Sequence, residues 1–273
     1  MKIGETKVWV NMPFLIQWER IGFLEDTLKA LSNWQVDFMR IIIFINAEDV
    51  DGLLTDMIAP FNKDITIEQI DVTENPLLLQ WGHKKYIPDF LESDYTHFIY
   101  TDGDIGINEF VFKYWLKTKK LLDRNGYNKF IPGTFRIETY QGVDYASDLT
   151  YRTDIDSLPT VKVRDKTFFI PQEPFQGISI MDKDMAKEHL NSEYYSPMMD
   201  QSMYKFGFGE TCISGYILHN VPEGYNHRIL LPLDDYKRSW VYHLPSNYAA
   251  NPDSEHGKIV ADYVYKRIWR KLK

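Results

Sequence analysis

His97-Phe98-Ile99-Tyr100-Thr101-Asp102-Gly103-Asp104-Ile105 joins a short, mostly apolar run to two aspartates that are one residue apart. The apolar run predicts a buried strand. The two aspartates then follow its C-terminal end, which is where open α/β sheets bind their ligands. Side chains at i and i+2 of an extended backbone point the same way. Asp102 and Asp104 are therefore expected to hold a hard divalent cation, Mn²⁺ or Mg²⁺, which prefers oxygen ligands.

The D-x-D spacing arises easily in an acidic chain, and it recurs at Asp154-Ile155-Asp156 and Asp182-Lys183-Asp184. The apolar strand directly before it distinguishes Asp102-Gly103-Asp104. The alternative is a solvated turn that merely closes the strand. An EF-hand loop fits worse, because its positions 5, 6 and 12, which should be a ligand, a glycine and a glutamate, fall on Gly106, Ile107 and Lys113.

The composition is that of a soluble globular protein: 273 residues, 44% of them hydrophobic and 26% charged. A net charge of −8 argues against general nucleic-acid binding, which needs a basic face. The single cysteine, Cys212, excludes an internal disulfide and a cysteine-rich metal site, and its neighbours predict a buried structural thiol. We find no secretory signal and no apolar run long enough to span a membrane, so a cytoplasmic location is expected.

Strand and helix patterns alternate in the first part of the chain. Strands are predicted at residues 7–11, 39–46, 65–72 and 97–101, and helices at 18–34, 50–61 and 77–90, the last limited by Pro88. This order predicts a doubly wound α/β sheet whose strands end at one edge. The polar residues at those strand ends, expected to line that edge, are Asn11, Asn46, Asp71 and Asp102.

Neither G-x-G-x-x-G nor G-x-x-x-x-G-K-S/T occurs in the sequence. If the protein binds a nucleoside diphosphate, we expect a metal ion to bind the phosphates in place of a glycine-rich loop.

The pattern changes after Asp104. The predicted helices lie at residues 109–122, 183–190, 198–206, 211–218 and from 257 onward. The predicted strands lie at 129–138, 166–171 and 175–181, and a strand followed by a loop is predicted over 238–248. Residues 140–163 are polar and mixed, and we expect a long excursion there. No linker separates the parts, so we expect one compact unit with two halves.

The order of these features resembles that of metal-dependent, nucleotide-sugar glycosyltransferases of the GT-A fold. The corresponding motifs are Asp102-Gly103-Asp104, the glycine loop Phe175-Gln176-Gly177, the acidic Gly209-Glu210-Thr211 and Tyr242-His243-Leu244-Pro245, with a basic stretch over residues 79–85. The acidic motif departs from the family in having Thr211 where aspartate is common.

The resemblance implies a Rossmann-like GT-A fold: α/β, with a mostly parallel central sheet, helices on both faces and a smaller acceptor-side half. Residues 1–108 would bind the donor, and 109–256 would bind the acceptor and carry catalysis. Residues 257–273 would form a basic amphipathic C-terminal helix.

The implied reaction moves a hexose from a nucleotide diphosphate sugar, most commonly a UDP-sugar, to a hydroxyl of a glycan or a lipid-linked acceptor. Inversion and retention both stay open. The implied metal ligands are Asp102, Asp104 and His243. The implied donor-binding residues are Asn11, Asn46, Asp71, Lys84, Lys85, Asp102, Gln176 and Gly177. Glu210 is the first candidate for the general base that inversion needs, and Asp200 the second.

Each of these residues also has a purely structural interpretation. Glu210 could simply interact favourably with the N-terminus of a helix. His243 could make an internal hydrogen bond, and Lys84 and Lys85 could lie on a solvated helix face. Gln176-Gly177 could only allow the backbone to bend. Two other functional classes also stay open. A metal-dependent sugar nucleotidyltransferase or phosphohydrolase would use paired aspartates too, although residues 11–14 lack the glycines usual in the former. A carbohydrate- or calcium-binding module would usually be all-β.

The C-terminal segment 258–273 reverses the charge of the chain locally. Ile259, Val260, Tyr263, Val264 and Ile268 form one apolar stripe at helical spacing, among six cations and a single acid. Such a helix could lie on an anionic membrane surface, giving peripheral contact with the inner membrane face. The alternative, that the stripe packs on the core, is preferred.

Overall fold

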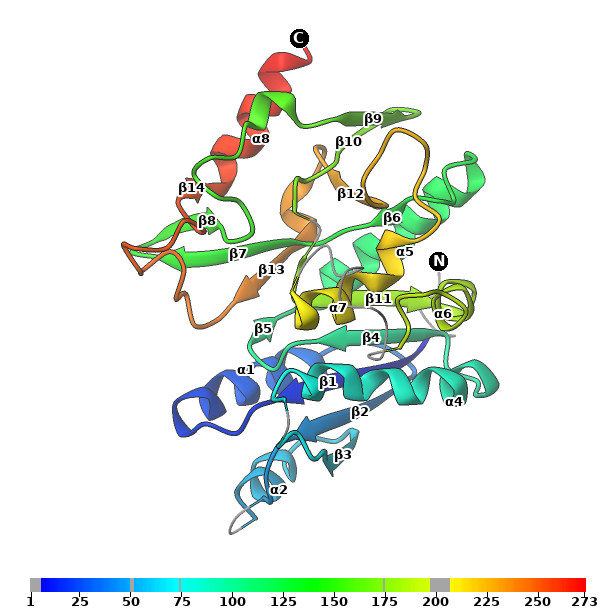
Figure 1. Cartoon of the computed structure of the whole chain (residues 1–273), viewed down its shortest axis with the longest axis vertical. Coiled ribbons are helices and arrows are strands. Elements are labelled where there is room, and N and C mark those ends of the chain that lie inside the picture. Colours follow the sequence, from blue (N-terminus) through cyan, green and yellow to red (C-terminus); the bar gives the residue numbers. More distant parts are fainter. Residues whose placement is uncertain (1–5, 50–51, 74, 174, 197–206) are drawn as a thin grey trace. The chain divides into compact units, whose positions relative to one another are not determined.

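The computed structural model describes residues 6–49, 52–73, 75–173, 175–196 and 207–273. The chain divides into two compact units, the first from residues 1–105 and 177–219 and the second from 106–176 and 220–273 (Figure 1). The sequence predicts two halves, 1–108 and 109–256, followed by a C-terminal helix, and the bounds of the two observed units differ from these. Residues 177–219 return to the first unit, and the C-terminal helix is part of the second.

The first unit is built on a five-stranded sheet in the order β11-β4-β1-β2-β3. Strands β1 (Lys7–Phe14), β2 (Phe38–Ile45), β3 (Asp64–Gln69) and β4 (His97–Thr101) are parallel, and β11 (Ile178–Asp182) pairs antiparallel with β4. Consecutive residues of β1 and β2 point to opposite faces yet are buried alike, so both faces of the sheet are covered. The predicted α/β fold class with a mostly parallel sheet is confirmed.

Strand β1 runs three residues past the predicted end at Asn11. Residues Met12 to Phe14, which lie beyond the predicted strand, also pair with β2. Strand β4 pairs with β1 only over residues 8–11, so Pro13 lies where β1 has one neighbour and its missing N–H is tolerated.

The helices of the first unit connect these strands. They are α1 (Ile21–Ser32, after the 3₁₀ turn η1, Trp18–Arg20), α2 (Leu53–Ile58), α3 (Leu78–Trp81), η3 (Gly82–Tyr86), α4 (Ile87–Glu92), α6 (Lys183–Leu190) and α7 (Phe208–Leu218). The helix predicted over 77–90 is thus three segments. Pro88 lies in the first turn of α4, where no backbone N–H is needed, and not at its end. The predicted helix 198–206 lies outside the described residues.

The second unit contains two small sheets, β6-β12-β10-β9 and β14-β8-β7-β13-β5. Their strands are β5 (Ile105–Gly106), β6 (Ile131–Pro132), β7 (Phe135–Tyr140), β8 (Val143–Ala146), β9 (Thr160–Val163), β10 (Lys166–Phe169), β12 (Ile229–Pro232), β13 (Trp240–His243) and β14 (Ile259–Val260). The second unit begins at Gly106, the second residue of β5. The unit also holds α5 (Glu109–Arg124) and the 3₁₀ turns η4 (Ile155–Ser157) and η6 (Tyr236–Ser239). The structureless excursion predicted at 140–163 is wrong, because β8 and β9 lie there.

The C-terminal helix α8 (Ala261–Lys271) packs against its own unit. Its buried residues are Ala261, Val264, Tyr265 and Ile268, and the ring of Tyr265 stacks on Tyr236 at 3.8 Å. The predicted stripe is correct for Val264 and Ile268, whereas Val260 and Tyr263 are exposed. Arg267 pairs with Asp156 of η4. None of the described helices is long and apolar enough to span a lipid bilayer.

Candidate functional site

The two aspartates of the D-x-D motif lie on a turn and not on an extended strand. Strand β4 ends at Thr101, and the N–H of Ile105 donates to the Asp102 carbonyl oxygen at 3.2 Å. The hydroxyl of Thr27 on α1 lies 3.3 Å from the carbonyl oxygens of both Gly103 and Ile105. The expected parallel alignment of the two carboxylates is therefore replaced by a turn anchored on α1, and each carboxylate has its own partner.

Tyr100 holds the Asp102 carboxylate. Its hydroxyl donates to Asp102 Oδ1 at 2.6 Å, and its side chain is fully buried. Burial and the neighbouring carboxylate raise the pKa of Tyr100 well above its ordinary value, so the phenol stays protonated and continues to donate.

Gly177 fits closely against Asp102. The Asp102 N–H donates to the Gly177 carbonyl oxygen at 2.9 Å. Gly177 has φ of 62°, and a Cβ placed there would lie 3.2 Å from Asp102 Oδ2 and 3.1 Å from Ile105 Cδ1. The predicted glycine is thus required by its backbone conformation and by the space that the aspartate occupies.

Asp104 is paired with a residue that the sequence did not suggest. Arg20 Nη2 donates to Asp104 Oδ2. The Asp104 side chain is 6% exposed and that of Arg20 is 36% exposed. The Arg20 guanidinium therefore supplies positive charge to a nearly buried carboxylate.

The other strand-end residues differ in their surroundings. Asn11 is fully buried inside β1, and its side-chain amide lies 3.5 Å from the carbonyl oxygen of Ile99. Its expected place at the sheet edge is wrong, since β1 continues past it. Asn46 does follow β2 and accepts from the Ile16 N–H at 2.8 Å. Asp71 lies two residues past β3 and is exposed; hydrogen bonds from Thr73 lower its pKa.

The two predicted phosphate-binding lysines are engaged within the first unit. Lys84 is 4% exposed, donates to the Tyr194 carbonyl oxygen at 2.6 Å and lies 4.0 Å from the Trp81 ring centroid. The solvated helix face expected as its structural alternative is therefore wrong for Lys84. Burial lowers the pKa of Lys84 to about 8. Lys85 is half-exposed and pairs with Glu68.

Glu210 lies in the first turn of α7, and its Oε2 accepts from the Gly207 N–H at 3.1 Å. The side chain is exposed, which a general base requires, although the contact also caps the helix. The second candidate base, Asp200, lies outside the described residues. Cys212 of the same helix is buried, as predicted, and burial raises the pKa of its thiol to about 12.

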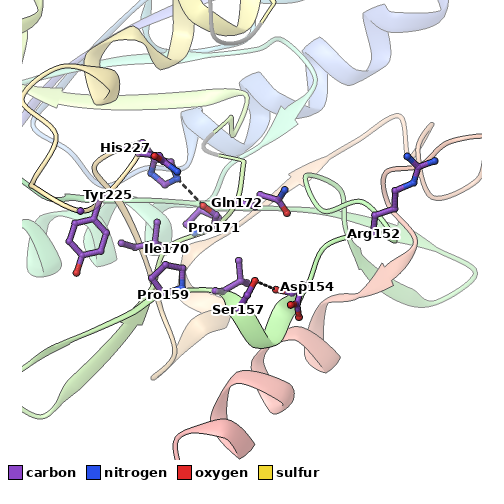
Figure 2. A pocket seen from close by; sticks show the side chains of 12 residues that line it. Arg152, Asp154, Ser157, Pro159, Ile170, Pro171, Gln172, Tyr225 and His227 are labelled. Carbon is purple, nitrogen blue, oxygen red and sulfur yellow. Dashed lines mark hydrogen bonds between the residues drawn. The ribbon is translucent and has the colours of Figure 1, made fainter.

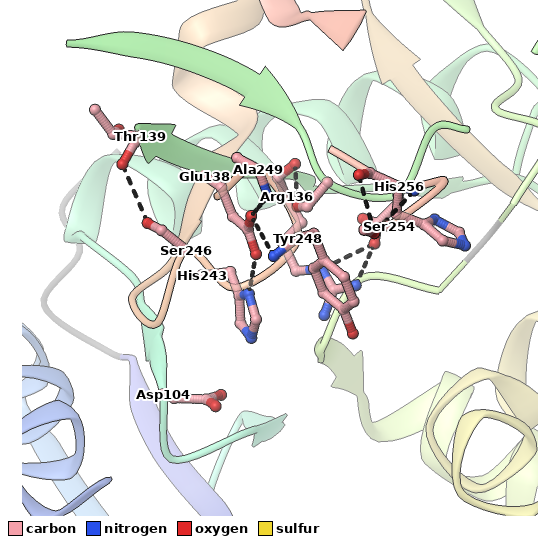
Figure 3. Close-up of polar contacts among 12 residues, drawn as sticks. Asp104, Arg136, Glu138, Thr139, His243, Ser246, Tyr248, Ala249, Ser254 and His256 are labelled. Atoms are coloured by element: carbon pink, nitrogen blue, oxygen red, sulfur yellow. Dashed lines mark hydrogen bonds and ion pairs between the residues drawn. The ribbon is translucent and has the colours of Figure 1, made fainter. Parts of the chain in front are cut away.

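In the second unit, His243 is held by a buried carboxylate (Figure 3). His243 Nδ1 lies 2.5 Å from Glu138 Oε1, and Glu138 Oε2 accepts from the N–H groups of Tyr248 at 3.0 Å and Ala249 at 2.5 Å. Glu138 is fully buried, and the His243 ring stacks on Tyr248 with centroids 5.3 Å apart. This arrangement fixes the ring and directs Nε2 away from Glu138.

Gln176, the neighbour of Gly177 in the predicted loop, is buried in the second unit. Its Oε1 accepts from the N–H of Thr134 at 2.9 Å and lies 3.1 Å from the Thr134 hydroxyl.

The second unit also carries a cavity of 330 Å³ that contains none of the predicted site residues (Figure 2). Its lining combines Pro159, Ile170 and Pro171 with polar groups that include Gln172, Asn226 and His227. His227 is locked in one tautomer, because Nε2 lies 2.8 Å from the Pro171 carbonyl oxygen and Nδ1 accepts from the Ile229 N–H.

The sequence did not indicate three residues that contact the predicted metal ligands: Arg20, Tyr100 and Glu138. Tyr100 could have been found, because it precedes Asp102 by two residues in the opening stretch. Arg20 and Glu138 carry no local signal, since their partners are 84 and 105 residues away.

No family model and no curated protein matches this chain. Among solved structures, the chain is similar to TarS of S. aureus, with 12% identity, a TM-score of 0.47, and coverage of 89% of this chain and 37% of that one. TarS 1–349 gives 10% identity and a TM-score of 0.44 over 97% of this chain and 71% of that one. The complex of TarS 1–349 with UDP-GlcNAc gives 12% identity and a TM-score of 0.36, over 67% of this chain and 47% of that one. The chain spans little more than a third of the first of these structures, and no residue role passes from them to it.

Proposed function

We propose that this protein is a glycosyltransferase that moves a hexose from a nucleotide diphosphate sugar, with UDP-sugars as the first class to test, to a hydroxyl of a glycan or lipid-linked acceptor. A divalent cation at Asp102 and Asp104 is part of this proposal, and the motif order in the sequence is its starting point.

One observation carries the proposal. The D-x-D turn ends the parallel strand β4 and is held in place by α1, through Thr27, and by the Gly177 carbonyl beside β11. Ligands of α/β sheets bind at this end of the strands. A turn that merely closed a strand would not need Tyr100 to orient one carboxylate or Arg20 to neutralise the other.

The residues fit a hard divalent cation. Asp102 and Asp104 offer carboxylate oxygens, and His243 offers an imidazole whose Nδ1 is held by a carboxylate, as is usual for metal-binding histidines. In the described parts of the chain, no three His, Cys, Asp or Glu side chains cluster as a metal site. We propose His243 as a ligand on the chemistry of its own surroundings. A bound cation would supply Lewis-acid stabilisation of the departing diphosphate.

The protein's own residues have separate tasks in this proposal. Tyr100 and Gly177 keep the Asp102 carboxylate in one orientation. Glu210, exposed at the start of α7, accepts the proton of the acceptor hydroxyl if the sugar inverts.

The rival function is a metal-dependent sugar nucleotidyltransferase or phosphohydrolase. A thermal-shift panel of UDP, GDP, CMP and sugar 1-phosphates, each with and without Mn²⁺, separates the two. The proposal expects stabilisation by a nucleoside diphosphate that requires Mn²⁺, followed by slow Mn²⁺-dependent hydrolysis of the matching nucleotide sugar. Stabilisation by a sugar 1-phosphate, with no effect of a nucleoside diphosphate, would favour the rival.

Variants connect this result to the site. Asp102→Asn and Asp104→Asn should each abolish Mn²⁺-dependent nucleotide binding, and Glu210→Gln should lower turnover by about 10²–10⁴ with donor binding kept. Asp144→Asn is the matched control, because this aspartate accepts from Thr139 on an exposed part of the second unit. Full activity of either D-x-D variant at limiting Mn²⁺ would refute the metal site.

A further inference from the structure

Arg20 lies on the same segment of the first unit that anchors the D-x-D turn. It ends η1 and immediately precedes α1, and α1 carries Thr27, which binds two carbonyl oxygens of that turn. Gly103 is packed in as well, since a Cβ there would lie 3.0 Å from Phe14 and 3.6 Å from Leu24 of α1. The helix that holds the turn therefore also sets the position of Arg20.

The pair joins a nearly buried acid to a half-buried base. Asp104 has 6% of its side chain exposed, so its negative charge needs a cation close by. Arg20 keeps 36% of its side chain exposed. A guanidinium has five N–H donors in a planar fork that matches phosphate as well as carboxylate. Arg20 thus donates from Nη2 to the Asp104 carboxylate, while part of its side chain is exposed to solvent.

We propose that Arg20 is a diphosphate-binding residue that neutralises Asp104 until a divalent cation is bound there. The inference rests on the proposed function. A cation held by Asp104 would compete with the Arg20 guanidinium for that carboxylate, and the displaced guanidinium would be available to donate hydrogen bonds to the diphosphate of the donor. The same side chain therefore opposes binding of the cation alone and favours binding of the nucleotide.

This dual role predicts effects of opposite sign in one variant. Arg20→Gln removes the charge and leaves a shorter, neutral polar side chain. Mn²⁺ should bind the nucleotide-free variant about three- to tenfold more tightly, because no guanidinium competes for Asp104. UDP should bind the Mn²⁺-saturated variant roughly 10- to 100-fold more weakly, the usual value of charged hydrogen bonds to phosphate.

Both affinities are measured by isothermal titration calorimetry, with GDP replacing UDP if that is the nucleotide the wild-type protein binds. Lys7→Gln is the matched control, since it breaks the exposed Lys7–Asp94 pair of the same unit and should move neither affinity. Arg20→Lys keeps the charge without the fork, so Mn²⁺ affinity should stay near that of the wild type while UDP binding falls.

The outcomes separate the inference from the function on which it rests. If wild-type protein binds UDP with Mn²⁺ but Arg20→Gln changes neither affinity, or weakens both, the inference is overturned and the proposed function stands. If the wild-type protein binds neither Mn²⁺ nor a nucleoside diphosphate, both are overturned.

Discussion

Replacing Gly177 by alanine tests whether the glycine loop shapes the aspartate site. At φ of 62°, any residue with a Cβ loses roughly 1–2 kcal/mol. The added methyl would also lie 3.2 Å from Asp102 Oδ2 and 3.1 Å from Ile105 Cδ1, and such overpacking costs roughly 1–3 kcal/mol. We therefore expect Gly177→Ala to lower the free energy of unfolding by roughly 2–5 kcal/mol.

Gly52→Ala separates the two contributions. Gly52 belongs to the same unit and has φ of 69°, but a Cβ there would meet nothing within 4 Å. It should therefore lose only the backbone part, roughly 1–2 kcal/mol. Urea unfolding followed by tryptophan fluorescence measures both variants.

The difference between the two variants reports the crowding of Asp102 and Ile105. Because the alanine methyl would push the Asp102 carboxylate, Gly177→Ala should also weaken Mn²⁺-dependent UDP binding, while Gly52→Ala should leave it unchanged. Equal losses of stability in the two variants, with UDP binding kept in both, would refute the close fit of Gly177 against the aspartate.

Three further predictions concern other parts of the chain. Burial lowers the pKa of Lys84 to about 8, so between pH 8 and about 10.4 the unfolded state binds more protons than the folded state. Over that window, the free energy of unfolding of the wild-type protein should rise by about 3 kcal/mol relative to that of Lys84→Met. Parallel pH curves of the two proteins would contradict this prediction. Glu138→Gln should weaken Mn²⁺ binding about 10- to 100-fold with an unchanged circular dichroism spectrum, and unaltered Mn²⁺ affinity would assign Glu138 and His243 to packing. Because the apolar face of α8 is buried, the protein should stay in the supernatant with anionic vesicles at about 0.15 M salt; pelleting that is lost in a Lys266→Gln, Arg270→Gln, Lys271→Gln variant would show a membrane contact.

The parallel core could be predicted from the sequence because its signal is local. Continuous apolar runs predicted β2 and β4, and the helix at 183–190 is found at its predicted bounds. The end of an element was less predictable. Strand β1 continues through Pro13 only because β4 stops pairing with it, and that depends on a strand nearly 90 residues further along the chain.

The sequence by itself determined the α/β class, the place of Asp102 and Asp104 after a buried strand, the glycine beside them and the buried thiol of Cys212. Side-chain periodicity and residue type suffice for these, because they reflect which face of an element avoids water. Only the tertiary structure decided the partners: Tyr194 for Lys84, Arg20 for Asp104 and Glu138 for His243. Those contacts join segments 84 to 110 residues apart, and no local pattern encodes which two segments the folded chain brings together.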